Sequence, residues 1–171
     1  AQQILDVTAR LLDEVGADAL TTILIAREMG ISVGTLYHYF PNKHAIMYAM
    51  AEQWLREVER SLTELDGWQF ADLEPEQFVD RLIERQLAVY KAQHGILHLV
   101  QAMFSVPELR ALDQRHDALV IERMTVVFAR YGLGGTTNEL GRLARAYLEL
   151  THALLLVVVN QGGIRARRTL A

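Results

Sequence analysis

Apolar residues recur every three or four positions along most of the chain, and no stretch alternates regularly between apolar and polar residues. This spacing puts apolar side chains on one face of an α-helix and differs from the two-residue period of a half-buried strand. The sequence therefore predicts an all-α fold. We expect helices over about residues 4–16, 22–29, 33–39, 42–65, 75–92, 94–104, 105–131 and 136–160.

Residues with known helix-end preferences stand at several of these boundaries. Asn42 is a favourable N-cap for the fourth helix, and Pro75 suits the first turn of the fifth. Two pairs have the spacing of a capping box, in which Ser or Thr is followed three residues later by Glu: Ser105 with Glu108, and Thr136 with Glu139. These boundaries divide the chain into a segment of short helices at residues 1–45 and a bundle of mostly longer helices at residues 46–171.

Composition excludes several classes of protein. The chain has 171 residues, of which 51% are hydrophobic and 22% are charged, so it is not intrinsically disordered. It contains no Cys, which excludes disulfides and cysteine-based zinc sites. The longest unbroken apolar run, Ala153–Val159, is much shorter than a membrane-spanning helix. From these features we expect a soluble, cytoplasmic protein with no membrane partner.

The second and third predicted helices have the features of a helix-turn-helix. Ala26 is small where two helices must approach closely, Gly30 can take the positive φ of a tight turn, and Ser32 can cap the next helix. Leu36 and Phe40 would anchor that helix to the core. Its other side chains would then face outward, where they can meet a DNA major groove. The alternative interpretation is a helical hairpin within an ordinary bundle.

The identities of the residues in this region point to a particular kind of protein more strongly than their spacing does. They read Thr21-Thr22-x-x-Ile25-Ala26-x-x-x-Gly30-Ile31-Ser32-x-Gly34-Thr35-Leu36-Tyr37-x-Tyr39-Phe40-x-Asn42-Lys43. This segment closely resembles the DNA-binding motif of TetR/AcrR-family regulators. The close similarity covers about residues 2–50, and the rest of the chain resembles the family in its succession of helices.

The resemblance implies a homodimeric transcriptional regulator, usually a repressor, that leaves double-stranded operator DNA when a small effector binds. It assigns a helix-turn-helix DNA-binding domain to residues 1–45 and a helical ligand-binding and dimerisation domain to residues 46–171. It also implies contacts from the matching motif positions. Those expected to touch bases or backbone are Ser32, Val33, Thr35, Tyr37 and His38, and those expected to touch phosphates are Thr22, Tyr39 and Lys43.

Two features depart from the family pattern. Ile23 and Leu24 occupy positions where the family often has polar residues, so we expect this face to pack against the protein. Residues 1–45 contain three basic and five acidic side chains, a net charge of −2, whereas phosphate contacts favour basic surfaces. Members of the family commonly carry a basic arm before the first helix and usually end with a further helix.

The resemblance implies an effector cavity among the later helices. Aromatic, methionine and histidine side chains at helical spacing are the candidates for its lining: Trp54, Tyr90, His94, His98, Met103, Phe104, Tyr147 and His152. Such a mixture suits a largely apolar ligand held by a few polar groups. The alternative is that these side chains simply fill a solid core.

His94 and His98 are four residues apart on one helix face, a spacing that can chelate a metal. They are the basis of an alternative function, a metal- or cofactor-dependent helical enzyme. However, no third ligand, nucleophile or general base accompanies them in the sequence. We therefore expect no catalytic residues, no metal site, no cofactor and no enzymatic activity.

The last predicted helix is apolar around most of its circumference near its end. A helix of this kind needs apolar partners on two sides. One side can be its own domain, and the other is most simply a second subunit, with Leu148, Leu155 and Val158 at the interface. Alternatively, a following helix of the same chain covers it.

Overall fold

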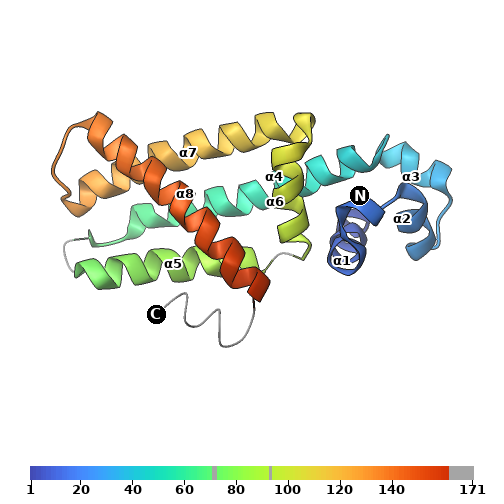
Figure 1. The fold of residues 1–171 in the computed structure, drawn as a ribbon, viewed down its shortest axis with the longest axis horizontal. Helices are drawn as coiled ribbons and strands as arrows, with labels where there is room; N and C mark the ends of the chain where they lie inside the picture. Colours follow the sequence, from blue (N-terminus) through green and yellow to red (C-terminus); the bar gives the residue numbers. More distant parts are fainter. Residues whose placement is uncertain (71–72, 93, 162–171) are drawn as a thin grey trace. The chain divides into compact units, whose positions relative to one another are not determined.

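A computed structural model describes residues 1–70, 73–92 and 94–161 (Figure 1). This part of the chain consists of helices and their connections and contains no β-strand. The helices are α1 (Gln2–Ala19), α2 (Thr22–Glu28), α3 (Val33–Tyr39), α4 (Lys43–Thr63), the 3-10 helix η1 (Glu64–Gly67), α5 (Pro75–Lys91), α6 (Ile96–Ser105), α7 (Pro107–Tyr131) and α8 (Thr137–Gln161). The predicted all-α fold is confirmed.

The helices form two compact units, Ala1–Leu55 with Gln93–Asp113, and Arg56–Ala92 with Gln114–Ala171. The first unit contains α1, α2, α3, α6 and the start of α4. The second contains η1, α5, α8 and most of α7. Helix α4 continues without a break across residues 45 and 46, so the domain boundary drawn there from the sequence stays a prediction.

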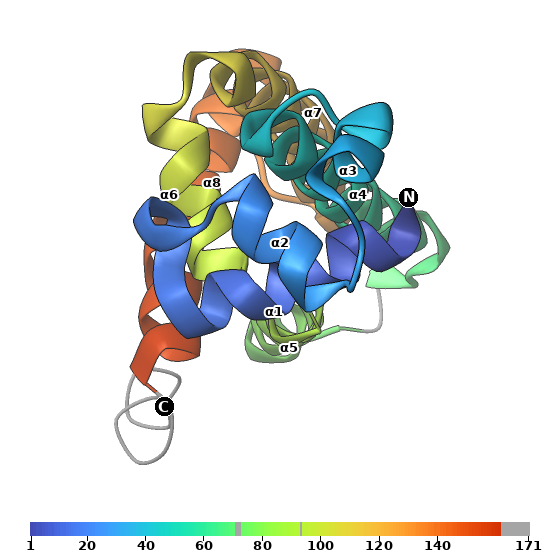
Figure 2. The same cartoon turned by 90° about the vertical axis from the view of Figure 1, so that its right-hand side faces the viewer.

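In the first unit, α1 to α4 share a core and α6 packs beside α1 (Figure 2). Gly95, just before α6, is the point of closest approach. A Cβ there would lie 2.9 Å from the carbonyl oxygen of Ala9 and from Cβ of Leu12, and the residue has φ of +70°. Its amide donates to Asp13 Oδ1 at 2.7 Å. Only glycine suits this position, because both the backbone conformation and the space exclude a side chain.

In the second unit, residues of α4, α5, α7 and α8 surround a separate core (Figure 1). Its largest contacts are aromatic: the rings of Phe78 and Tyr131 stack with centroids 4.3 Å apart, and Phe128 meets Tyr147 edge to face. The buried members are Leu62, Leu65, Phe70, Phe78, Leu82, Val120, Met124, Val127, Phe128, Leu140, Ala144 and Leu148.

Most predicted helix ends agree with the structure, and one capping box does not. Thr136 and Glu139 form theirs: the Thr136 amide donates to Glu139 Oε2 at 2.7 Å, and the Glu139 amide donates to Thr136 Oγ1 at 3.3 Å. Ser105, by contrast, ends α6, so the prediction that it opens the next helix is wrong. Pro107 explains the difference, since proline pushes the preceding Val106 into an extended conformation and itself suits a first helical position.

Candidate nucleic-acid interface and effector cavity

Short-range hydrogen bonds fix the turn between α2 and α3. Thr21 Oγ1 accepts from the Leu24 amide at 3.1 Å and caps α2, while Ser32 Oγ accepts from the Thr35 amide at 3.0 Å and caps α3. Gly30 lies between the two helices with φ of +66°. These residues satisfy backbone groups that a helix end leaves open, which is why so short a pair of helices keeps a defined geometry.

The inner sides of α2 and α3 are packed as the sequence predicts. Ile25, Ala26 and Leu36 are fully buried, and Phe40 at the end of α3 is half-buried. The small side chain of Ala26 admits the neighbouring helix. Because Leu36 fixes the rotation of α3 about its axis, the outward direction of the other α3 side chains is determined.

The outer side of α3 carries most of the predicted DNA contacts. Ser32, Thr35, Tyr37, His38 and Tyr39 are exposed, whereas Val33 is half-buried. These side chains offer hydroxyl and imidazole groups that can donate to or accept from base edges and phosphates.

Two pairs of side chains order this surface further. Tyr37 Oη lies 3.2 Å from Thr22 Oγ1, so the first residue of α2 and the middle of α3 present their hydroxyls together. The His38 ring meets the Tyr39 ring edge to face with centroids 5.5 Å apart. The structure thus brings residues predicted from separate positions of the motif onto one surface.

Lys43 has a partner that the sequence did not indicate. Its Nζ donates to the carbonyl oxygens of Ala17 and Leu20, at 3.1 and 3.2 Å. Ala17 lies in the last residues of α1, after the non-helical Gly16 (φ 75°), and Leu20 is the residue that follows α1. Lys43 therefore ties the start of α4 to the end of α1, in addition to the phosphate contact predicted for it.

The expectation that Ile23 packs against the protein is wrong. Its side chain is 67% exposed, while Leu24 is half-buried. Ile25 and Ala26 occupy the core, and Ile23 consequently points away from it. An exposed aliphatic side chain next to Thr22 can contact a thymine methyl group, so Ile23 belongs with the candidate DNA-facing residues.

The predicted cavity-lining residues fall in both units. Trp54 and Met103 are buried in the first unit, which also holds His94 and His98. Tyr90, Tyr147 and His152 belong to the second. Phe104 lies in α6, but its side chain is outside the described residues.

The second unit contains a small cavity of about 20 Å³ that includes two of the predicted residues, Tyr90 and His152. Its apolar lining is Val58, Leu62, Val89, Val120 and Leu148, and its polar lining is Ser61, Gln86, Tyr90, His116, Thr151 and His152. All of these side chains belong to one unit, and none is a carboxylate, an ammonium or a guanidinium group.

Three rings of the polar lining contact one another. The His116 and His152 rings stack nearly parallel with centroids 6.0 Å apart, and Tyr90 meets His152 edge to face at 6.3 Å. Burial, followed by the nearby His152, lowers the pKa of His116 from 6.5 to about 4. Both effects disfavour the protonated ring, so His116 is neutral at pH 7.

His116 was not among the predicted lining residues. The signal available in the sequence was its spacing: it stands four positions after Leu112 and four before Val120, both of which are buried. Tyr147, which was predicted, lies in the neighbouring core, where burial raises the pKa of its hydroxyl.

The His94 and His98 pair does not assemble a metal site. His94 Nδ1 lies 3.1 Å from Asp13 Oδ2, and this carboxylate also accepts from the Gly95 amide. Among the described residues, no group of three or more His, Asp or Glu side chains is arranged to hold a metal ion. The pair instead stands where α6 begins beside α1, and the enzymatic alternative gains no support.

Helix α8 exposes an apolar stripe, and Leu148, one of the three predicted interface residues, is not part of it. Leu148 is buried in the core of its own unit and offers no surface to a partner, while the side chains of Leu155 and Val158 are outside the described residues. The exposed members recur every three or four positions: Leu143, Ala146, Leu150, Ala153, Leu154 and Val157. No helix in the described part of the chain has the length and apolar character needed to cross a membrane.

Curated relatives of the chain include bacterial transcriptional regulators. It is 24% identical over 131 residues to the HTH-type transcriptional regulator BetI of Vibrio atlanticus, a match over 72% of this chain and 64% of that protein. It is 47% identical over 47 residues to the class A tetracycline repressor protein from transposon 1721 of Escherichia coli, over 28% of this chain and 22% of that protein. Matches to three BetI proteins from Vibrio cover 64%, 51% and 66% of their lengths.

Solved structures share the fold. The TetR-family regulator PfmR from Thermus thermophilus superposes with a TM-score of 0.76 and 19% identity, covering 98% of this chain and 92% of its own. BioQ, solved with its natural double-stranded DNA operator, gives a TM-score of 0.58 and 17% identity, covering 98% and 93%.

Family models cover most of the chain. Residues 4–50 match the N-terminal model of bacterial regulatory proteins of the tetR family, and residues 74–171 match a tetracycline repressor-like C-terminal domain. The first match includes all of the α2–α3 turn, and the second spans more than half of the chain. The resemblance predicted from the motif is confirmed. The chain belongs to the TetR family.

Proposed function

We propose that the chain is a transcriptional regulator that binds operator DNA as a homodimer and leaves it when a small, largely apolar ligand binds. The observation that carries the proposal is the outer face of α3, with its exposed hydroxyl and imidazole groups and a rotation fixed by Leu36. Membership of the TetR family and the BetI relatives, which are named transcriptional regulators, support the same function.

In this function α3 enters the major groove and α2 lies against the backbone. Thr35, His38 and Ile23 are placed to meet base edges or thymine methyl groups, while Thr22 and Tyr39 reach phosphates. BioQ, whose fold is similar, was solved on its DNA operator. Because residues 1–45 have a net charge of −2, direct contacts must contribute more than general electrostatic attraction.

A second copy of the chain is the natural partner for the apolar stripe of α8. The exposed residues Leu143, Ala146, Leu150 and Val157 follow the spacing of a helix–helix seam. A two-fold dimer pairs the same stripe from both chains and so covers it without another protein. It also presents two copies of α3, as a symmetric operator requires.

Helix α4 connects DNA binding with ligand binding. Its first residue, Lys43, is tied to the end of α1, and its later residues Val58, Ser61 and Leu62 line the cavity. A ligand that displaces the end of α4 changes the position of its start, and with it the spacing of the two α3 helices in the dimer. The ligand then favours a state that no longer fits both half-sites.

Fluorescence anisotropy with labelled duplexes tests the function. The wild-type protein should bind the intergenic DNA upstream of its own gene at least about tenfold more tightly than a duplex of scrambled sequence. Tyr37→Phe should weaken binding by about fivefold, since one hydroxyl contact is lost. The matched control, Tyr48→Phe in α4, should leave it unchanged. Equal affinity of the wild-type protein for the two duplexes would contradict the proposal.

A further inference from the structure

The cavity of the second unit has a neighbour on the surface. A groove of about 540 Å³ is lined by residues of α4, η1, α5 and the residue that follows η1, including Arg60, Trp68 and Arg81. Ser61 and Val89 line both the groove and the cavity. The outer groove and the inner space therefore adjoin at the seam between α4 and α5, at these two residues.

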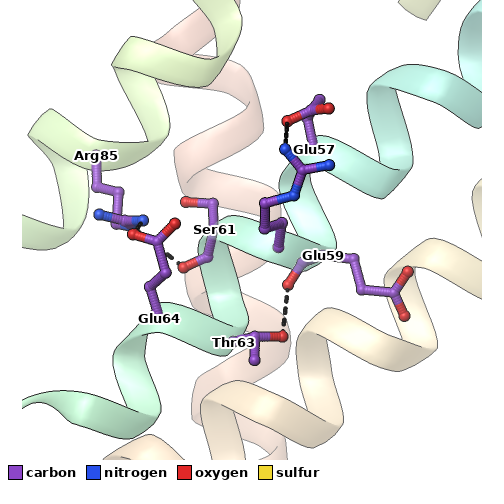
Figure 3. Close-up of polar contacts among 7 residues, drawn as sticks. Glu57, Glu59, Ser61, Thr63, Glu64 and Arg85 are labelled. Carbon is purple, nitrogen blue, oxygen red and sulfur yellow. Dashed lines mark hydrogen bonds and ion pairs between the residues drawn. The ribbon is translucent and has the colours of Figure 1, made fainter.

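One side chain bridges the two helices at this seam. Arg85 of α5 donates from Nε to the carbonyl oxygen of Ser61 at 3.1 Å and forms an ion pair with Glu64 (Figure 3). Ser61 lies in the last turn of α4, where carbonyl groups lack partners within the helix and favour a cation. Arg85 is only 29% exposed, so these contacts are partly shielded from water.

The closed cavity is too small for an effector. Its volume of about 20 Å³ corresponds to a single water molecule. A larger molecule needs the helices around the cavity to move apart, and separation of α4 from α5 would join the cavity to the groove. Residues that line both spaces are where that opening begins.

We propose that the effector enters the cavity between α4 and α5, past Ser61 and Val89. The contacts of Arg85 with Ser61 and Glu64 keep this path closed until the effector enters. The effector is an uncharged, mainly apolar molecule whose hydrogen-bonding group contacts His116 and His152. This inference rests on the proposed function, because it names the path and class of ligand for the same cavity.

The chemistry of the two spaces selects the ligand class. The cavity contains no charged side chain, and a buried charge without a partner is costly. The groove is lined by three Arg and three Glu residues, so it favours neither cations nor anions overall. The apolar side chains of Val58, Leu62 and Val120 suit a hydrocarbon body, and the neutral imidazole of His116 can donate and accept hydrogen bonds.

Stopped-flow fluorescence with N-phenyl-1-naphthylamine, an uncharged aromatic amine that brightens in apolar sites, tests the path. Arg85→Ala should raise the association rate constant by about tenfold, because a hydrogen bond to a charged group is removed from the closed state. Arg81 lines the same groove without bonding to Ser61, so Arg81→Ala is the control. Its association rate constant should match that of the wild type. Val89→Trp should block the seam between α4 and α5 and abolish the rapid increase in probe fluorescence. Val79→Trp, on the exposed surface of α5, should leave that increase unchanged.

Each variant is first compared with the wild type by thermal melting and by affinity for the intergenic duplex, so that a loss of DNA binding is separated from a change of ligand path. Arg85→Lys, which keeps the charge, should give an intermediate rate. Equal rates for Arg85→Ala and Arg81→Ala, normal binding by Val89→Trp, or no binding of the probe to the wild type and Arg85→Ala would each overturn the proposal.

Discussion

Lys43 illustrates how one side chain serves both the fold and the proposed interface. The motif predicts a phosphate contact for it, and the structure adds two hydrogen bonds to the carbonyls at the end of α1. A flexible ammonium group can keep one of these bonds and turn another proton toward DNA. Its loss should therefore be visible in two separate measurements.

Lys43→Ala should lower the free energy of unfolding by about 1 kcal/mol, a figure reduced because the ammonium group is only half-buried. It should also reduce the slope of log affinity for DNA against log salt concentration by about one. Chemical denaturation and anisotropy at several salt concentrations measure the two effects. Lys91→Ala, an exposed lysine of α5, is the control. An unchanged denaturation midpoint would show that the contact with α1 contributes nothing to stability.

His116 gives the chain a defined response to acid. An unfolded histidine titrates near pH 6.5, whereas the folded His116 has a pKa of about 4. Between these values the unfolded state binds one more proton, so the free energy of unfolding falls as the pH falls. This loss in the free energy of unfolding is absent above about pH 6.5 and complete below the pKa of the folded state.

His116→Leu should remove this response. The wild type should lose about 2 kcal/mol more than the variant between pH 7 and about pH 4.5, as the difference in pKa implies. Urea denaturation at a series of pH values measures it, with His44→Leu, in the first unit, as the control. Parallel pH profiles for the wild type and His116→Leu would show that the ring is not held neutral by burial.

At the scale of elements, the sequence predicted the helices and the α2–α3 turn because local chemistry determines them. Apolar spacing, Gly30 and the cap residue Ser32 act over a few residues, so each leaves a readable signal. A local signal also explains the wrong prediction at Ser105. Its spacing to Glu108 matches a capping box, but Pro107 begins the helix instead. Where two local signals conflict, the stricter backbone constraint decides.

The apolar stripe of α8 predicts that a charge placed in it prevents dimerisation. Leu150 is 63% exposed in the single chain, more than Leu143, Leu154 or Val157 on the same helix. Leu150→Glu should yield monomers in sedimentation velocity at micromolar concentration, since a charge opposite its own copy is costly in an apolar interface. Arg142→Ala, beside the stripe, should remain dimeric. A wild-type monomer at that concentration would contradict the assignment of α8 to the interface.

At the scale of the whole molecule, the sequence identified which side chains are buried more reliably than which of them share a cavity. Trp54 and Met103 are buried, as apolar spacing suggested, but they belong to the first unit. Tyr90 and His152 do meet at the cavity, together with His116 from a third helix. Periodicity fixes the inward face of each helix, whereas the arrangement of helices depends on long-range packing that a single sequence does not reveal.

The central claim is that two copies of α3 read a symmetric DNA sequence. Selection of binding duplexes from a random library, followed by sequencing, tests it most directly because no operator has to be assumed. We expect enrichment of an inverted repeat whose half-sites lie about one helical turn or a multiple apart, and weaker enrichment with Tyr37→Phe than with Tyr48→Phe. If a folded, dimeric protein enriches no sequence, or only one without two-fold symmetry, the two α3 helices do not read a symmetric operator.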